Sequence, residues 1–149
     1  MSSEKGADPA SAADAMSLVA TQELLHAARA ALERYQDVEI DDDGALTFRH
    51  SDVPCAVQAV ELAEGLVVLS LTCVVAWDLP AEGDIGDRIA TRAGQGLFGT
   101  LGQVRTDRGI DVTLRYTFPA AGLDPVPLGT LLMLVVSTAS QVRGELLAA

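Results

Sequence analysis

Two short segments carry residue types that could bind a ligand directly, and the first is rich in glycine. Gly94–Gly99 matches G-x-G-x-x-G, the pattern in which backbone N–H groups approach a dinucleotide phosphate at a helix N-terminus. That chemistry requires a strand before the glycines and a helix after them. Here the apolar spacing predicts a helix before them, from about Gly83 to Ala93, and a strand after them, from Leu97 to Arg105. We interpret the segment as a helix-to-strand turn and predict no cofactor.

The second segment is a run of carboxylates. Glu39, Asp41 and Asp43 precede Gly44 with the spacing of the first half of an EF-hand calcium loop. The twelfth position of that loop would be His50 instead of a bidentate carboxylate, and strands are predicted on both sides in place of helices. A solvated turn is favoured and no metal site is predicted, with a structural calcium site as the alternative.

The histidines and cysteines give no catalytic signature. His26 and His50 have no cysteine pair at zinc-ligand spacing, and no nucleophile lies in a recognisable elbow. No catalytic residue is predicted, and a small-molecule or metal-binding enzyme is the least supported alternative. Cys55 and Cys73 are interpreted as two small buried thiols in a reducing cytosol, with a redox-sensitive pair as the alternative.

These residues surround a central hairpin with arms Val53–Leu62 and Leu66–Trp77. A three-residue loop with Gly65 in the left-handed conformation pairs Cys55 with Cys73 and Glu61 with Val67. One face of the hairpin is then nearly all apolar and faces the core: Val53, Cys55, Val57, Val67, Leu69, Leu71, Cys73 and Val75. The other face mixes apolar and polar residues, which is typical of a partner-binding surface. The residues predicted there to bind a partner are Gln58, Val60, Leu66, Val68, Ser70, Thr72 and Val74.

The remaining elements follow from periodicity. They are a helix from Ala12 to Tyr35 with Leu18, Leu25, Ala28 or Arg29, Leu32 and Tyr35 in its apolar stripe, strands over Val38–Ile40, Leu46–Phe48, Leu97–Arg105 and Ile110–Phe118, and a helix from Pro125 to about Leu147. The predicted order is α-β-β-β-α-β-β-α, or the same order with a fourth strand before the middle helix. Clustered strands predict an α+β domain, an antiparallel sheet of about five strands with helices on one face.

Composition limits the partners. The 149 residues are 49% apolar and 4% aromatic, with a formal charge of −11, which disfavours nucleic acid and anionic membranes. Between Asp37 and Glu64 there are eight acids and one base, Arg49. Residues 1–11 are predicted to be a disordered lead and residues 12–149 a single domain, in a cytoplasmic protein.

Several local stretches resemble a known family. They are Asp43-Gly44-x-x-x-Phe48, the paired strands ending in Leu79-Pro80, Phe98-Gly99-Thr100-Leu101, and Tyr116-Thr117-Phe118 before Gly122-Leu123. With the element order, they make the chain from about Leu18 to Leu147 resemble YbjN and type III secretion chaperone-like proteins. The resemblance implies a small cytosolic bacterial protein, often a homodimer, that holds a polypeptide segment and catalyses no reaction.

The functional prediction combines this resemblance with the mixed face of the hairpin. We expect a non-catalytic module that binds a partner protein or peptide through the semi-apolar face of the sheet. The main alternative is a homodimeric structural or regulatory subunit that uses the same face for self-association.

Overall fold

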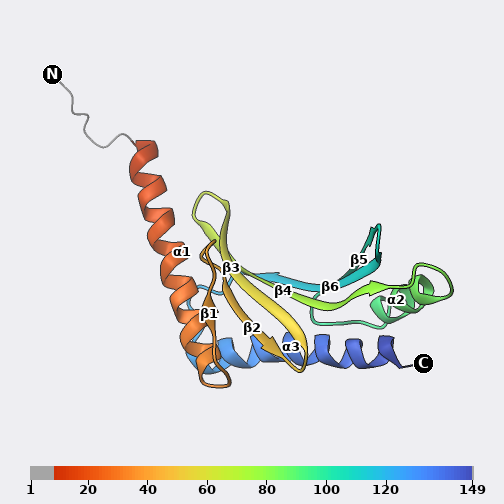
Figure 1. Cartoon of the computed structure of the whole chain (residues 1–149). Helices are drawn as coiled ribbons and strands as arrows, with labels where there is room; N and C mark the ends of the chain where they lie inside the picture. The colour runs from red at the N-terminus through yellow and green to blue at the C-terminus, as the bar shows by residue number, and fades with distance from the viewer. Residues whose placement is uncertain (1–8, 149) are drawn as a thin grey trace.

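Residues 9–148, which the computed structural model describes, form a six-stranded sheet with two long helices against one face (Figure 1). The elements are α1 (Pro9–Glu33), β1 (Glu39–Ile40), β2 (Leu46–His50), β3 (Val53–Ala63), β4 (Leu66–Leu79), α2 (Ile85–Ala93), β5 (Thr100–Thr106), β6 (Gly109–Phe118) and α3 (Pro125–Leu147). Every strand pair is antiparallel, and the order across the sheet is β1-β2-β3-β4-β6-β5. The predicted α+β class is confirmed; β1, with two residues, is the fourth strand before α2.

The N-terminal boundary differs from the prediction. Of the segment expected to be a disordered lead, residues 1–8 lie outside the described residues and residues 9–11 already belong to α1. Pro9 stands at the first helical position, where its fixed φ favours a helix and its missing N–H costs nothing. The helix therefore begins three residues before the predicted Ala12.

The predicted register of the central hairpin is confirmed. Cys55 pairs with Cys73, and Glu61 pairs with Val67. Because side chains alternate between the faces of a strand, this register points Leu69 and Leu71 toward the helices, where both are fully buried. We call this side of the sheet the inner face and the opposite side the outer face.

The helices fill the inner face in different ways. α3 lies along the sheet and buries one stripe against it: Leu128, Gly129, Leu132, Val135, Val136, Ala139, Val142 and Leu146. By length and composition alone α3 could cross a membrane, and 39% of its most apolar window is buried in the structure. Near its start, Gly129 allows α1 to approach closely, since a Cβ there would lie 3.3 Å from the Ala31 carbonyl oxygen.

Only the C-terminal part of α1 packs on the body. Its buried residues are Leu24, Ala28, Ala31 and Leu32, whereas Leu18 and Tyr35, both expected in the apolar stripe, are 58% and 52% exposed. The predicted stripe is wrong at Tyr35 because α1 ends at Glu33, and at Leu18 because the first half of the helix extends beyond the sheet (Figure 1). Leu18 therefore has no core to pack against, and the projecting half of α1 becomes a wall beside the sheet.

Candidate functional site

The residues predicted to bind a partner lie together on the outer face of β3 and β4. The ladder places Gln58 beside Ser70 and Val60 beside Val68, with Thr72 and Val74 further along β4. Gln58, Val60 and Leu66 are exposed, while Ser70, Thr72 and Val74 are half-buried. The Thr117 hydroxyl donates a hydrogen bond to the Ser70 hydroxyl at 3.3 Å, so part of the polar character of this face is used within the sheet.

Val68 is the one member of this set that the structure removes from the surface. It is only 2% exposed and lies outside the cluster of residues buried on the inner face. Val60, its direct partner in the β3–β4 ladder, is the exposed member of the pair. Two β-branched side chains opposite each other on one sheet face pack together, so the outer one covers the other. Val68 therefore supports this face from below and does not itself contact a partner.

The second half of β3 has an unpaired edge. β2 pairs with β3 only from Val53 to Val57, whereas β4 pairs with β3 as far as Ala63. The segment Gln58–Ala63 therefore has a strand neighbour on one side only. An unpaired strand edge presents backbone N–H and C=O groups that can pair with an added strand.

A groove lies along this edge, between it and the projecting half of α1. Its walls are Leu18, Thr21, Gln22 and Leu25 from α1, Asp43, Gly44 and Ala45 from the β1–β2 turn, and Gln58, Ala59 and Val60 from β3. We call this the apical groove; its volume is about 480 Å³, within the usual range for ligand pockets. Aliphatic side chains on two walls and exposed amides of Gln22 and Gln58 at the lip suit a polypeptide segment.

Exposed apolar side chains gather at this end of the molecule. Six large ones belong to the projecting half of α1 and to the tip of the β3–β4 hairpin: Met16, Leu18, Val19, Val60, Leu62 and Leu66. Both segments extend past the body of the sheet (Figure 1). Leu18 and Val60 line the groove, whereas Met16 and Val19 line a separate pocket on α1. Isolated exposed apolar residues are ordinary, but several at one end of a molecule mark an interaction surface.

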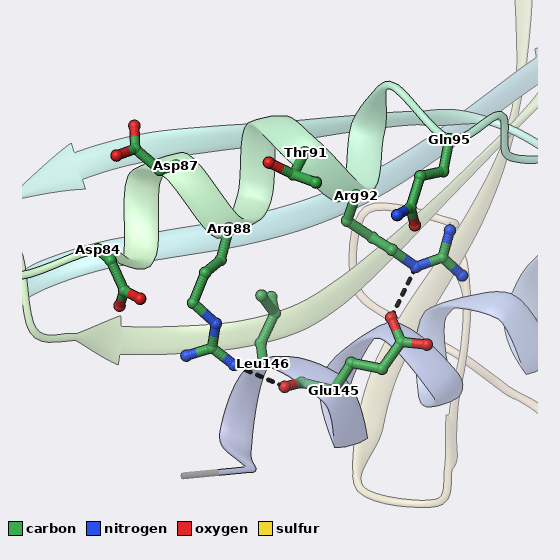
Figure 2. A pocket seen from close by; sticks show the side chains of 8 residues that line it. All are labelled: Asp84, Asp87, Arg88, Thr91, Arg92, Gln95, Glu145 and Leu146. Atoms are coloured by element: carbon green, nitrogen blue, oxygen red, sulfur yellow. Dashed lines mark hydrogen bonds and ion pairs between the residues drawn. The ribbon is translucent and has the colours of Figure 1, made fainter.

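A second pocket, between α2 and the end of α3, is already occupied by internal contacts (Figure 2). Arg88 Nη2 donates a hydrogen bond of 2.7 Å to the Glu145 carbonyl oxygen, and Arg92 Nε forms a 2.6 Å ion pair with Glu145 Oε1. Cations at a helix C-terminus satisfy its free carbonyl groups and oppose its dipole. Both arginines therefore hold the end of α3, so of these two pockets the apical groove is the stronger candidate.

The two motifs considered first have structural explanations. Asp41 Oδ1 accepts hydrogen bonds from the backbone N–H groups of Asp43 and Ala45, each at 2.9 Å, so this carboxylate stabilises the β1–β2 turn. Gly99 has φ +110° and follows α2, as the turn interpretation requires. A Cβ on Gly99 would lie 2.9 Å from the Arg115 carbonyl oxygen, so the glycine permits close approach to β6.

Cys55 and Cys73 are buried free thiols whose Sγ atoms lie 3.6 Å apart. The hydrogen bond with Cys73, followed by burial, raises the pKa of the Cys55 thiol above its ordinary value. Only the thiolate is nucleophilic, so the folded protein should protect both groups.

We expect neither thiol to react with a maleimide in the folded protein, and both to react in denaturant. Because the pKa of Cys55 is raised on folding, its contribution to stability is complete below the ordinary thiol pKa of about 8.5 and is lost as the pH rises above it. Cys55→Ala should therefore reduce the loss of stability at alkaline pH. If maleimide labels neither cysteine even in denaturant, the prediction of two free thiols is contradicted and the redox-sensitive pair is supported.

Sequence reasoning found part of this site. Gln58 and Val60 belong both to the predicted set and to the apical groove, whereas Leu18 and Leu25 were assigned to the core stripe of α1. The available signal was the difference in strand length: an arm of about three residues, Leu46–Phe48, cannot pair along the whole of Val53–Leu62.

Comparisons with known proteins give one informative result. No protein-family model matches the chain, and no curated protein matches it. Among solved structures, the chain is similar to one in the crystal structure of the ExsC–ExsE complex, with a TM-score of 0.58 and 20% identity over 87% of this chain and 98% of that chain. The two share a fold, and the resemblance to YbjN and type III secretion chaperone-like proteins stays a prediction.

Proposed function

We propose that this protein binds an extended segment of a partner polypeptide in the apical groove and catalyses no reaction. The observation that carries the proposal is the unpaired edge at Gln58–Ala63, which forms one wall of a groove whose opposite wall contains Leu18 and Leu25. An added strand would satisfy the backbone groups of this edge, and its side chains would pack against Leu18 and Leu25. Buried apolar area would stabilise the complex by about 25 cal/mol per Å² before ordering costs.

The comparison supports this proposal at the level of fold. The similar chain was solved within a complex of two named proteins, ExsC and ExsE, so this fold has been observed in a protein–protein complex. Self-association through the outer face of β3 and β4 and a cytoplasmic location both stay predictions. The exposed and half-buried residues of that face, which include Leu66, Thr72 and Val74, remain available for a second copy or for a longer partner.

Selection of random peptides displayed on phage would test the proposal without a known partner. We expect the selected peptides to be rich in apolar residues and to lose at least about tenfold in affinity when Leu18 or Val60 is replaced by Ser, which corresponds to about 1.4 kcal/mol. The matched control is Val104→Ser, which changes another exposed valine, on β5. Peptides that bind the Leu18→Ser and Val104→Ser proteins equally well would contradict the proposed site.

A further inference from the structure

The charges beside the apical groove are mostly negative. Its lining residues come from three segments, residues 18–25 of α1, residues 43–45 of the β1–β2 turn and residues 58–60 of β3, and Asp43 is the charged residue among them. The stretches that contain and flank these segments carry nine acids: Asp14, Glu23, Asp37, Glu39, Asp41, Asp42, Asp43, Glu61 and Glu64. All nine are exposed, and within residues 9–148 none of them forms an ion pair.

Three arginines border these stretches: Arg34, Arg29, which pairs with Glu33, and Arg49, which donates a hydrogen bond to the Asp52 carbonyl oxygen. The others lie elsewhere in the fold: Arg88 and Arg92 hold the end of α3, and Arg108 lies 3.9 Å from Asp78. Arg143 donates a hydrogen bond to the Val75 carbonyl oxygen at 3.0 Å and lies over the Trp77 ring. The nine acids outnumber the three bordering arginines, so this region would attract positive charge on an occupant.

The unpaired edge adds a constraint on the sequence of the occupant. A strand added beside Gln58–Ala63 would direct alternate side chains to opposite sides. One set would lie on the side of α1, which contributes Leu18 and Leu25 to the groove, and the other would lie on the outer side with Val60. Both sides therefore present apolar side chains, with Asp43 lining the groove and Glu61 and Glu64 at the adjacent hairpin tip.

We propose that the occupant of the apical groove is an extended segment of a partner protein that carries both apolar residues and Lys or Arg. The inference rests on the proposed function and adds the chemical class of the partner to it. The groove and the strand edge provide the binding site, and the exposed carboxylates beside them select a basic sequence over a neutral or acidic one. Charge selection of this kind increases the association rate and weakens as salt screens it.

Three synthetic peptides of about ten residues, the length of a long strand, would test the inference. All three carry Val and Thr at alternate positions, and the remaining positions are Lys in the first, Gln in the second and Glu in the third. We expect fluorescence anisotropy to show the Lys peptide binding at least about tenfold more tightly than the Gln peptide at low salt, with the difference reduced at high salt. The Glu peptide should bind most weakly.

Matched charge variants separate the groove from the overall acidity of the protein. Asp42→Asn, Asp43→Asn and Glu64→Gln together remove one carboxylate that lines the groove and two from the segments beside it, and Asp41 is kept because it stabilises the turn. The control, Glu82→Gln with Asp84→Asn and Asp87→Asn, removes three exposed carboxylates from the region of α2. The preference for Lys should decrease about tenfold in the first variant and stay unchanged in the control.

The outcomes distinguish the two proposals. Equal losses in both charge variants would overturn the inference, because the peptide would then respond only to net charge. The inference would also be overturned if the Lys and Gln peptides bind equally well at all salt concentrations. If Leu18→Ser weakens the binding of both peptides in that case, the proposed function is left intact. If Leu18→Ser changes the binding of none of the three peptides, both the inference and the groove as the binding site are overturned.

Discussion

Replacing Leu71 by Ala is expected to lower the free energy of unfolding by about 3 kcal/mol. Leu71 is fully buried on the inner face of β4, between Val57 on β3 and Tyr116 on β6. Truncation there would remove apolar contacts and leave a cavity that the surrounding side chains cannot fill, since both neighbouring strands and the helices fix its walls. Urea unfolding followed by the fluorescence of Trp77, the single tryptophan, would measure the change.

Leu66→Ala provides the control on the same strand and with the same residue type. Leu66 is 43% exposed at the hairpin tip, so its truncation should cost less than about 1 kcal/mol. The difference between the two losses of unfolding free energy measures how much more the inner face of β4 is buried than the outer face. Equal losses of stability would contradict the assignment of Leu71 to the inner face.

Replacing Gly109 by Ala is expected to cost about 3 kcal/mol or more. Gly109 begins β6 with φ +139°, a conformation that residues with a side chain rarely adopt. A Cβ on this residue would also collide with the Leu79 carbonyl oxygen at the end of β4. Because both groups belong to the backbone of paired strands, neither can move without disturbing the β4–β6 ladder, in which Leu79 pairs with Ile110.

Gly122→Ala separates the cost of the backbone conformation from the cost of a steric clash with the new Cβ. Gly122 has φ +89°, but nothing lies within 4 Å of a Cβ built there. Only the conformational cost remains, about 1–2 kcal/mol. A thermal melt in which Gly109→Ala is as stable as Gly122→Ala would show that β6 does not pass this close to the end of β4.

The turns of the sheet could be predicted because local chemistry determines them. Gly65 takes φ +78° in the β3–β4 loop, and this fixed the register that places Cys55 opposite Cys73. Once the register was known, alternation assigned Leu69 and Leu71 to the core. The faces of β3 and β4 were therefore assigned correctly from the sequence. The prediction that Val68 is exposed was wrong because its exposure depends on Val60 across the ladder.

The position of α1 could not be predicted in the same way. Alanine is frequent throughout this helix, so periodicity gave no unique stripe, and the buried side was decided by contacts with distant residues. Ala31 lies against Gly129 of α3, where two small residues allow the helices to approach. The apical groove depends on this placement together with the short β2, which is why sequence alone identified one of its walls and not the other.

The most direct test of the proposed function is a solution footprint of a selected peptide on the isotope-labelled protein. Methyl and amide resonances would be assigned by NMR, and the peptide would be added to saturation. If the peptide binds in the apical groove, the largest shifts occur at Leu18, Leu25 and Val60 and along the backbone of Gln58–Ala63. Largest shifts at Val126 and Leu134, on the exposed side of α3, with no change at Leu18 or Val60, would contradict the account.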